Sequence, residues 1–187
     1  MRLCVRTAGP RPRRKATENA MTEAEVQIRK RSTRRAMLSM RRRLDPSWKR
    51  DADRRINQQL MDYLRHDDPP VVVAYATDGT EPDLTRTMRQ VLSDGRTLCL
   101  PRFRGDGEFE IVIADTLELP ESHWNIPEAG AGALRASPEL MSKALWLFPG
   151  VAFDAKCNRL GRGKGIYDRL LSGGVRKSIG IYYDLQK

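Results

Sequence analysis

The sequence of 187 residues contains few histidines and aromatic residues, and it has no long apolar run. Its two histidines, His66 and His123, form no triad-like or metal-like cluster, and the three cysteines, Cys4, Cys99 and Cys157, include no CxxC pair. We therefore expect neither a histidine-based catalytic triad nor structural zinc. An odd cysteine count without a signal peptide predicts reduced thiols and a cytoplasmic protein. No stretch approaches the roughly 20 apolar residues that cross a bilayer, so a membrane span is excluded.

Composition and length predict one folded unit. Hydrophobic residues make up 40% and charged residues 31% of a 21.3 kDa chain, which is typical of a single globular domain. The domain is assigned to residues 21–187, and we expect it to be a monomer.

The net charge of +10 lies at the N-terminal end. Residues 1–60 contain 18 basic and 6 acidic residues, whereas the remainder contains 16 and 18. A basic arm can bind nucleic acid through phosphate contacts. This arm has one aromatic residue, Trp48, and so lacks a stacking platform for single strands. A nucleic-acid binder is therefore kept only as a minor alternative.

Residues 1–20 are rich in arginine and nearly free of acid, and they are predicted to form a disordered basic extension. An organelle-targeting segment and a start codon placed too far upstream both explain this composition. Thr22 and Glu25 have capping-box spacing at the head of a helical run. The ordered domain is therefore expected to begin near Met21.

The hydrophobic pattern predicts an α/β fold with a mostly parallel sheet, flanking helices and an added antiparallel hairpin. In the second of two N-terminal helices, Trp48, Ala52, Ile56 and Leu60 recur every fourth residue and form one apolar face. The predicted helices span 22–44 and 84–92, and the helix that carries this face begins after Asp45 and ends before the breaker at 67–70. The predicted strands span 71–75, 97–100, 144–148 and 178–183, the hairpin spans 103–114, and 115–140 form a long functional loop.

Near the C-terminal end, three glycines alternate with cations between a predicted strand and a predicted helix. Gly161, Gly163 and Gly165 allow positive φ angles and a close backbone approach to a ligand. Arg162 and Lys164 stand between them and add positive charge suited to phosphate oxygens. The segment 158–168 is therefore predicted to bind a polyphosphate, with a flexible, solvated basic turn as the alternative.

This loop matches neither of two well-known phosphate-binding patterns. A Walker loop requires Ser or Thr after Gly-Lys, but Gly165 follows Lys164. A dinucleotide-binding fingerprint requires a glycine at position 166, where the chain has Ile166.

The segment resembles the signature of the 5-formyltetrahydrofolate cyclo-ligase family, approximately P-G-x-A-F-D followed by R-L-G-x-G-x-G-x-Y-D. The matches are 149–154 and 159–168, with shorter matches at 79–81, 100–102 and 126–128. The resemblance covers about residues 28–187. Two positions depart from the family pattern. Ile166 stands where the family usually has an aromatic residue, and Cys157 stands where glycine is common.

The resemblance implies an enzyme of one-carbon metabolism, a ligase that uses ATP and Mg²⁺ to convert 5-formyltetrahydrofolate into 5,10-methenyltetrahydrofolate with release of ADP and phosphate. It implies catalytic roles for Arg159 and Lys164 and a Mg²⁺ ligand at Asp168; a helix N-terminal charge is the alternative for Asp168. The implied ATP contacts are Arg31, Arg35, Arg159, Leu160, Gly161, Arg162, Gly163, Lys164, Gly165, Ile166 and Tyr167, and the implied folate contacts are Ala76, Glu81, Arg162, Gly163, Lys164, Gly165 and Ile166.

Three alternatives stay open beside these roles. Arg31 and Arg35 lie among many arginines, so a merely solvated face explains them as well. Tyr167 has a core position as its alternative. Family members continue beyond the glutamine that Gln186 matches, so a C-terminal segment is expected to be missing, and a catalytically silent ATP- or folate-binding homologue is the alternative to an active enzyme.

Overall fold

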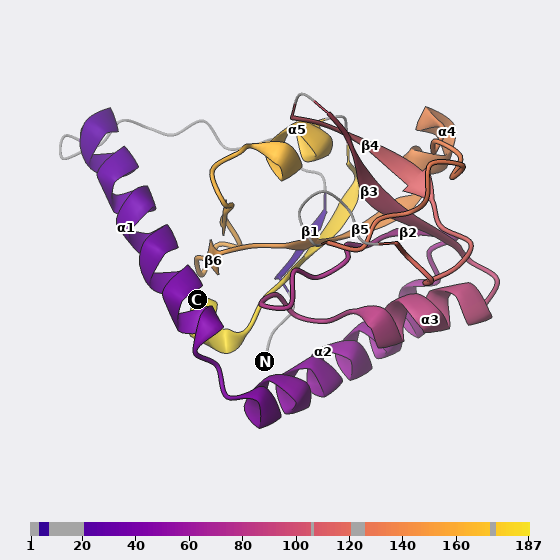
Figure 1. Ribbon diagram of the computed structural model, residues 1–187, viewed down its shortest axis with the longest axis horizontal. Helices are drawn as coiled ribbons and strands as arrows, with labels where there is room; N and C mark the ends of the chain where they lie inside the picture. The colour runs from indigo at the N-terminus through magenta and orange to yellow at the C-terminus, as the bar shows by residue number, and fades with distance from the viewer. Residues whose placement is uncertain (1–3, 8–20, 106, 121–125, 173–174) are drawn as a thin grey trace.

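The computed structural model describes residues 4–7, 21–105, 107–120, 126–172 and 175–187. Its centre is a six-stranded sheet of order β1-β8-β5-β2-β3-β4 (Figure 1). The four inner strands β8, β5, β2 and β3 are parallel, and β1 and β4 add antiparallel edges. The strands are β1 (Cys4–Thr7), β2 (Val71–Val73), β3 (Thr97–Gly105), β4 (Glu108–Ile113), β5 (Ala144–Pro149) and β8 (Lys177–Ile181). The predicted α/β class is confirmed.

Helices cover both faces of the sheet (Figure 1). On one face, α2 (Pro46–Asp67) and α3 (Thr85–Ser93) pack on Val72, Leu98 and Leu145. On the other face, α4 (Pro138–Ser142) and α5 (Ile166–Ser172) pack near Trp146. The first helix, α1 (Glu23–Arg42), stands at one end of the sheet, and the chain ends in a short 3-10 helix, η1 (Asp184–Gln186).

Side-chain caps explain where the first two helices begin. Thr22 and Glu25 form the predicted capping box at α1, because the Thr22 side chain accepts from Glu25 N and the Glu25 carboxylate accepts from Thr22 N. Asp45 caps α2 by accepting from the backbone N–H groups of Ser47 and Trp48 at 2.9 Å each. The Asp45 cap lies at the sharp corner between the two helices.

The predicted apolar face of α2 is confirmed except at its first residue. Ala52, Ile56 and Leu60 are buried in the core. Trp48 remains 37% exposed and packs edge-to-face against Tyr183 with 5.4 Å between ring centroids. Trp48 lies in the first turn of the helix, and its ring is only partly covered there.

Several elements differ from the sequence-based expectations. Residues 4–7 form β1 on the edge of the sheet, although the segment 1–20 is predicted to be disordered. The predicted strand 97–100 and the first arm of the hairpin are one continuous strand, β3. The segment 115–140 ends inside α4, which begins at Pro138 and ends at Ser142. Cys99 is a buried free thiol, but Cys157 is disulfide-bonded, so the expectation of three reduced thiols is wrong. No helix among the described residues has the length and apolar character that a membrane span requires.

The parallel strands bring two distant loops to the same edge of the sheet. The carboxyl ends of β2 and β5 are neighbours, because Val73 pairs with Trp146. The loop 74–84 after β2 and the segment 150–165 after β5 therefore meet beside the C-terminal half of α1. In an open parallel sheet this edge is the usual place for a ligand.

Candidate functional site

A short hairpin carries the glycine-rich loop to the edge of the sheet. Its strands, β6 (Ala152–Phe153) and β7 (Arg159–Leu160), pair antiparallel in a separate two-stranded sheet. Asp154 fixes the turn between them: its carboxylate accepts from the backbone N–H groups of Lys156 at 2.9 Å and Asn158 at 2.8 Å. The pattern P-G-x-A-F-D thus builds the support of the loop, which the sequence analysis does not predict.

Two of the three alternating glycines have the backbone conformation that requires glycine. Gly163 has φ +105° and Gly165 has φ +67°, a region that side chains disfavour. Gly165 lies directly before Ile166, the first residue of α5. The loop therefore turns twice within three residues and then enters a helix.

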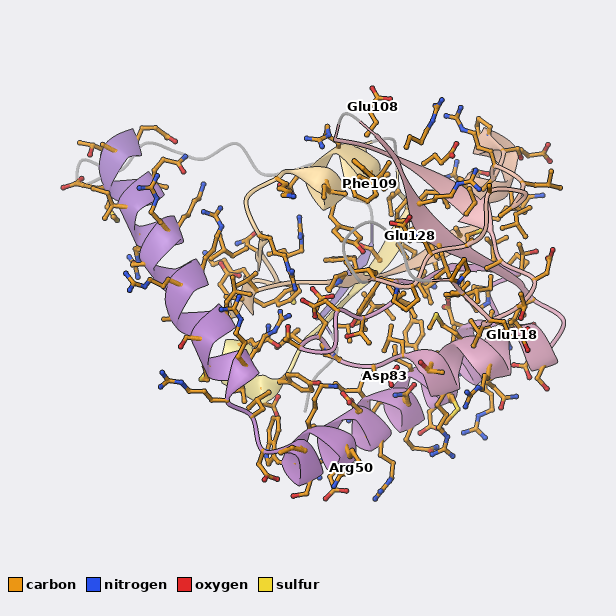
Figure 2. All side chains as sticks on the ribbon, viewed as in Figure 1. Arg50, Asp83, Glu108, Phe109, Glu118 and Glu128 are labelled. Carbon is orange, nitrogen blue, oxygen red and sulfur yellow. The ribbon has the colours of Figure 1, made fainter. Side chains whose placement is uncertain are left out.

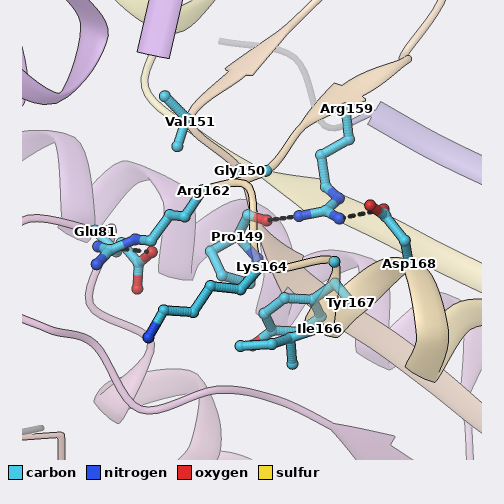
Figure 3. Close-up of a pocket in the computed structure, with 12 residues that line it drawn as sticks. Glu81, Pro149, Gly150, Val151, Arg159, Arg162, Lys164, Ile166, Tyr167 and Asp168 are labelled. Atoms are coloured by element: carbon cyan, nitrogen blue, oxygen red, sulfur yellow. Dashed lines mark hydrogen bonds and ion pairs between the residues drawn. The ribbon is translucent and has the colours of Figure 1, made fainter. Parts of the chain in front are cut away.

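An open pocket with about 440 Å³ of empty volume lies against this loop (Figure 3). The residues lining it come from the loop, from the end of β5 and from the segment after β2: Glu81, Pro149, Gly150, Val151, Arg159, Gly161, Arg162, Lys164, Gly165, Ile166, Tyr167 and Asp168.

Arg159 is held at one side of the pocket by three kinds of contact. Its Nη2 donates to Asp168 Oδ1 at 2.5 Å, and its Nη1 donates to the Pro149 carbonyl at 3.5 Å (Figure 3). Its guanidinium carbon lies 5.4 Å from the Tyr167 ring centroid and 5.9 Å from that of Phe148. These contacts fix the orientation of a charge that faces the pocket.

Arg162 and Lys164 extend from the loop toward the side where Glu81 lies (Figure 3). Arg162 Nη2 donates to Glu81 Oε1 at 3.3 Å and also to Asp78 Oδ2. Lys164 is exposed and lines the pocket. The loop thus presents three cations to one cavity, one of them paired with carboxylates from the segment after β2.

Two arginines of α1 that the sequence analysis does not select hold this site together. Arg34 Nε donates to the Gly161 carbonyl at 2.8 Å. Arg41 is only 2% exposed; its Nε donates to the Thr80 carbonyl at 3.1 Å and its Nη1 to the Gly150 carbonyl at 3.3 Å. Residues seven apart in a helix lie on the same face, but Arg35 and Arg42 have the same spacing as Arg34 and Arg41, so the sequence alone does not distinguish the two pairs.

The two carboxylates near Arg162 have opposite shifts in pKa. Glu81 is only 8% exposed, and this burial raises its pKa. The negative charge of Asp78 raises it further, whereas the charges of Arg162 and Arg41 lower it by less. For Asp78 burial alone would raise the pKa, but hydrogen bonds and the charge of Arg162 outweigh burial and lower it. Glu81 is therefore the carboxyl group of this pair that is more easily protonated.

The structure brings most of the predicted site residues to the pocket and leaves some outside it. Glu81, Arg159, Gly161, Arg162, Lys164, Gly165, Ile166, Tyr167 and Asp168 line it. Leu160 and Gly163 belong to the loop but are not among the lining residues, and Ala76 follows β2 without reaching the cavity. Arg31 and Arg35 are exposed on α1 and do not line the pocket either.

The implied Mg²⁺ has one carboxylate candidate here. Asp168 has a side chain that is 74% exposed and paired with Arg159. Among the described residues no group of three or more His, Cys, Asp or Glu side chains could hold a metal. Mg²⁺ is commonly bound through one or two carboxylates together with substrate phosphates and water, so a single carboxylate fits an ion that arrives with a phosphate ligand.

Comparison with known proteins agrees with the signature in the loop. The model of the 5-formyltetrahydrofolate cyclo-ligase family matches residues 26–186, nearly all of the described domain. The chain belongs to the 5-formyltetrahydrofolate cyclo-ligase family. The match includes the segment after β2 and the glycine-rich loop, which both line the pocket, and α1 from residue 26 onward, whose Arg34 and Arg41 hydrogen-bond to these two segments.

Individual relatives and solved structures give the same family. The chain is 27% identical over 124 residues to a Mus musculus protein named 5-formyltetrahydrofolate cyclo-ligase, covering 62% of this chain and 60% of that protein. It is 33% identical over 81 residues to a Schizosaccharomyces pombe protein named "Probable 5-formyltetrahydrofolate cyclo-ligase", covering 42% of this chain and 40% of that protein. The chain therefore spans 60% and 40% of the lengths of these two relatives.

The fold is similar to two solved 5,10-methenyltetrahydrofolate synthetase structures. The structure from Aquifex aeolicus has a TM-score of 0.72 and 29% identity, covering 84% of this chain and 79% of that one. The structure from Mycoplasma pneumoniae has a TM-score of 0.66 and 24% identity, covering 84% and 87%. The second likeness concerns the fold alone.

Proposed function

We propose that the protein converts 5-formyltetrahydrofolate into 5,10-methenyltetrahydrofolate and uses ATP to do so. The observation that carries this proposal is the pocket itself, which is lined by the three cations Arg159, Arg162 and Lys164 and by the carboxylate of Glu81. The cations suit a polyphosphate. The carboxylate of Glu81 suits the N–H groups of a pterin ring.

The proposed reaction needs no nucleophilic side chain. The formyl oxygen attacks the γ-phosphorus of ATP, and the bond to the bridging oxygen breaks and releases ADP. N10 of the folate then attacks the formyl carbon, loses its proton, and the phosphate leaves with the formyl oxygen. The protein has to position these groups and neutralise the phosphate oxygens, and the cationic loop is suited to both tasks.

Each residue of the loop has a role in this proposal that follows from its contacts. Lys164 and Arg162 neutralise phosphate oxygens, and Arg159 adds a fixed charge whose orientation Asp168 and Pro149 determine. Asp168 would hold Mg²⁺, which supplies further neutralisation of the phosphates when bound. The backbone of Gly163 and Gly165 allows the chain to approach the phosphates closely.

The direct test is to incubate the protein with 5-formyltetrahydrofolate, ATP and Mg²⁺ and to follow the ultraviolet absorbance of the methenyl product. We expect absorbance to rise only when ATP and the folate are both present. Thermal stabilisation by ATP without any product would instead select a catalytically silent binder. Lack of both product and stabilisation would contradict the proposal.

A further inference from the structure

The glycine-rich loop and the segment after β2 are joined by a cluster of four charged side chains. Arg162 Nη2 contacts both Asp78 Oδ2 and Glu81 Oε1. Arg41 Nη2 lies 3.6 Å from Asp78 Oδ1 and 3.7 Å from Glu81 Oε1. Two guanidinium groups thus face two carboxylates, and the cluster is balanced in charge only while Arg162 is part of it.

The two arginines differ in their freedom to leave this cluster. Arg41 has a fully buried side chain, and it also donates to the carbonyl oxygens of Thr80 and Gly150, so its position is fixed. The side chain of Arg162 is 46% exposed, and Gly163, with φ +105°, follows it. Arg162 is therefore the member that a ligand can draw away.

We propose that Arg162 is shared between the two halves of the site, so that binding of a nucleoside triphosphate releases Glu81 for the folate. The inference rests on the proposed function, because it places the phosphates at the loop and the pterin at Glu81. Each ligand has to break the contacts of Arg162 with Asp78 and Glu81. Whichever binds first removes that cost for the second, so each strengthens the binding of the other by the same factor.

Asp78 is a positioning residue in this scheme. It is not among the described residues that line the pocket, and it acts by holding Arg162 against Glu81. Its Oδ1 accepts from the backbone N–H groups of Thr80 at 2.9 Å and Glu81 at 3.1 Å, which forms the turn of this segment. An asparagine keeps these two hydrogen bonds, so Asp78→Asn removes the charge and preserves the turn.

Calorimetry measures how strongly binding of one ligand affects the Kd of the other. The two ligands are 5-formyltetrahydrofolate and a nucleotide with an imido bridge between its β- and γ-phosphates. In the wild-type protein we expect the Kd of the folate to fall about five-fold when the nucleotide is saturating. This factor corresponds to about 1 kcal/mol, the contribution expected of the ion pair that Arg162 makes. In Asp78→Asn the folate should bind more tightly without nucleotide, and the ratio of the two Kd values should fall toward one. Glu118→Gln is the matched control, because Glu118 is exposed and lies near α3, away from the pocket (Figure 2). This variant should keep the five-fold ratio.

Arg162→Gln gives a second and independent reading. Loss of the cation should weaken binding of the nucleotide, and loss of the contact with Glu81 should strengthen binding of the folate alone, with a ratio near one. Equal ratios in wild type and Asp78→Asn would overturn the inference, as would a wild-type protein that binds both ligands without coupling. Failure of the wild type to bind either ligand would overturn the proposed function and this inference with it.

Discussion

Arg34 in α1 donates a hydrogen bond of 2.8 Å from its Nε to the carbonyl oxygen of Gly161, 127 positions further along the chain. The first helix therefore holds the start of the glycine-rich loop. A Cβ placed on Gly163 would lie 3.7 Å from the guanidinium carbon of Arg34, so the same side chain also packs against the second glycine. The neighbouring Arg35 is exposed and does not line the pocket.

This contact predicts that Arg34→Gln raises the KM for ATP by roughly three- to ten-fold, because the loop loses a hydrogen bond from a charged donor, which contributes about 1.5–3 kcal/mol, and only part of that loss reaches the phosphates. Steady-state kinetics of methenyl formation measures this. Arg35→Gln is the matched control and should change the KM less than two-fold. The resemblance selects Arg31 and Arg35 as ATP contacts. A larger effect at Arg35 would show that this choice is right and that the choice of Arg34 is wrong.

The buried amide of Gln186 predicts a large effect on stability. Its Nε2 donates to the carbonyl oxygens of Gly150 at 2.8 Å and Val151 at 2.9 Å, and its Oε1 accepts from Tyr183 N at 3.0 Å. Gln186→Ala should lower the free energy of unfolding by about 2–4 kcal/mol, because Val151 O and Tyr183 N lose the buried amide as a partner and Gly150 O keeps only its longer bond from Arg41. Urea denaturation measures this. The exposed Gln58, replaced by Ala, should change the same quantity by about 0.5 kcal/mol or less.

Glu81 predicts a dependence of stability on pH. Burial, together with the charge of Asp78, raises its pKa in the folded protein above the ordinary 4.5. The folded state therefore binds more protons than the unfolded state between these two pKa values, and stability from this group falls as pH rises through that window. Relative to the wild type, Glu81→Gln should become more stable as pH rises above 4.5, the ordinary glutamate pKa. The measurement is the free energy of unfolding of both proteins at each pH.

Asp78 supplies a control of opposite sign. Its pKa is lowered below 3.8 in the folded protein, because the hydrogen bonds and charge of Arg162 outweigh burial. Its contribution to stability is present above the ordinary aspartate pKa and is lost as pH falls through the folded value. Relative to wild type, Asp78→Asn should therefore lose stability as pH rises toward 3.8, the ordinary aspartate pKa, from below. The same trend with pH for both variants would show that the shifts are assigned to the wrong carboxylates.

Local signals in the sequence predicted those parts of the fold that depend on neighbouring residues. The capping box of Thr22 and Glu25 and the Asp45–Pro46 corner place the ends of α1 and α2 within one or two residues. The β-branched run at 71–75 marks β2, although the ladder ends at Val73. The hairpin at 103–114 was recognised, but its first arm continues β3 without a break because Pro101 still pairs with Ile111.

Contacts between distant segments could not be found in this way. Arg41 lies in a run of three arginines with no local signal that it is buried; burial follows from the meeting of Thr80 and Gly150 beside it. Asp78 becomes part of the site only because Arg162 crosses to it from 84 positions away. The β6–β7 hairpin was missed because strands of two residues leave no periodicity.

Figure 2 shows Glu108 and Phe109 near α5, a closeness that Arg169 fixes by donating to the Gly107 carbonyl at 3.1 Å.

The most direct measurement of the central claim, that the glycine-rich loop grips the phosphates of ATP, is the KM for ATP in Lys164→Ala compared with Lys156→Ala. Both lysines are exposed and belong to the same segment, but only Lys164 lines the pocket. We expect Lys164→Ala to raise the KM roughly 10- to 100-fold, since a charged hydrogen bond contributes about 1.5–3 kcal/mol, with a free energy of unfolding changed by no more than about 0.5 kcal/mol. Lys156→Ala should leave both quantities unchanged. An ordinary KM for ATP in Lys164→Ala would contradict the assignment of this loop.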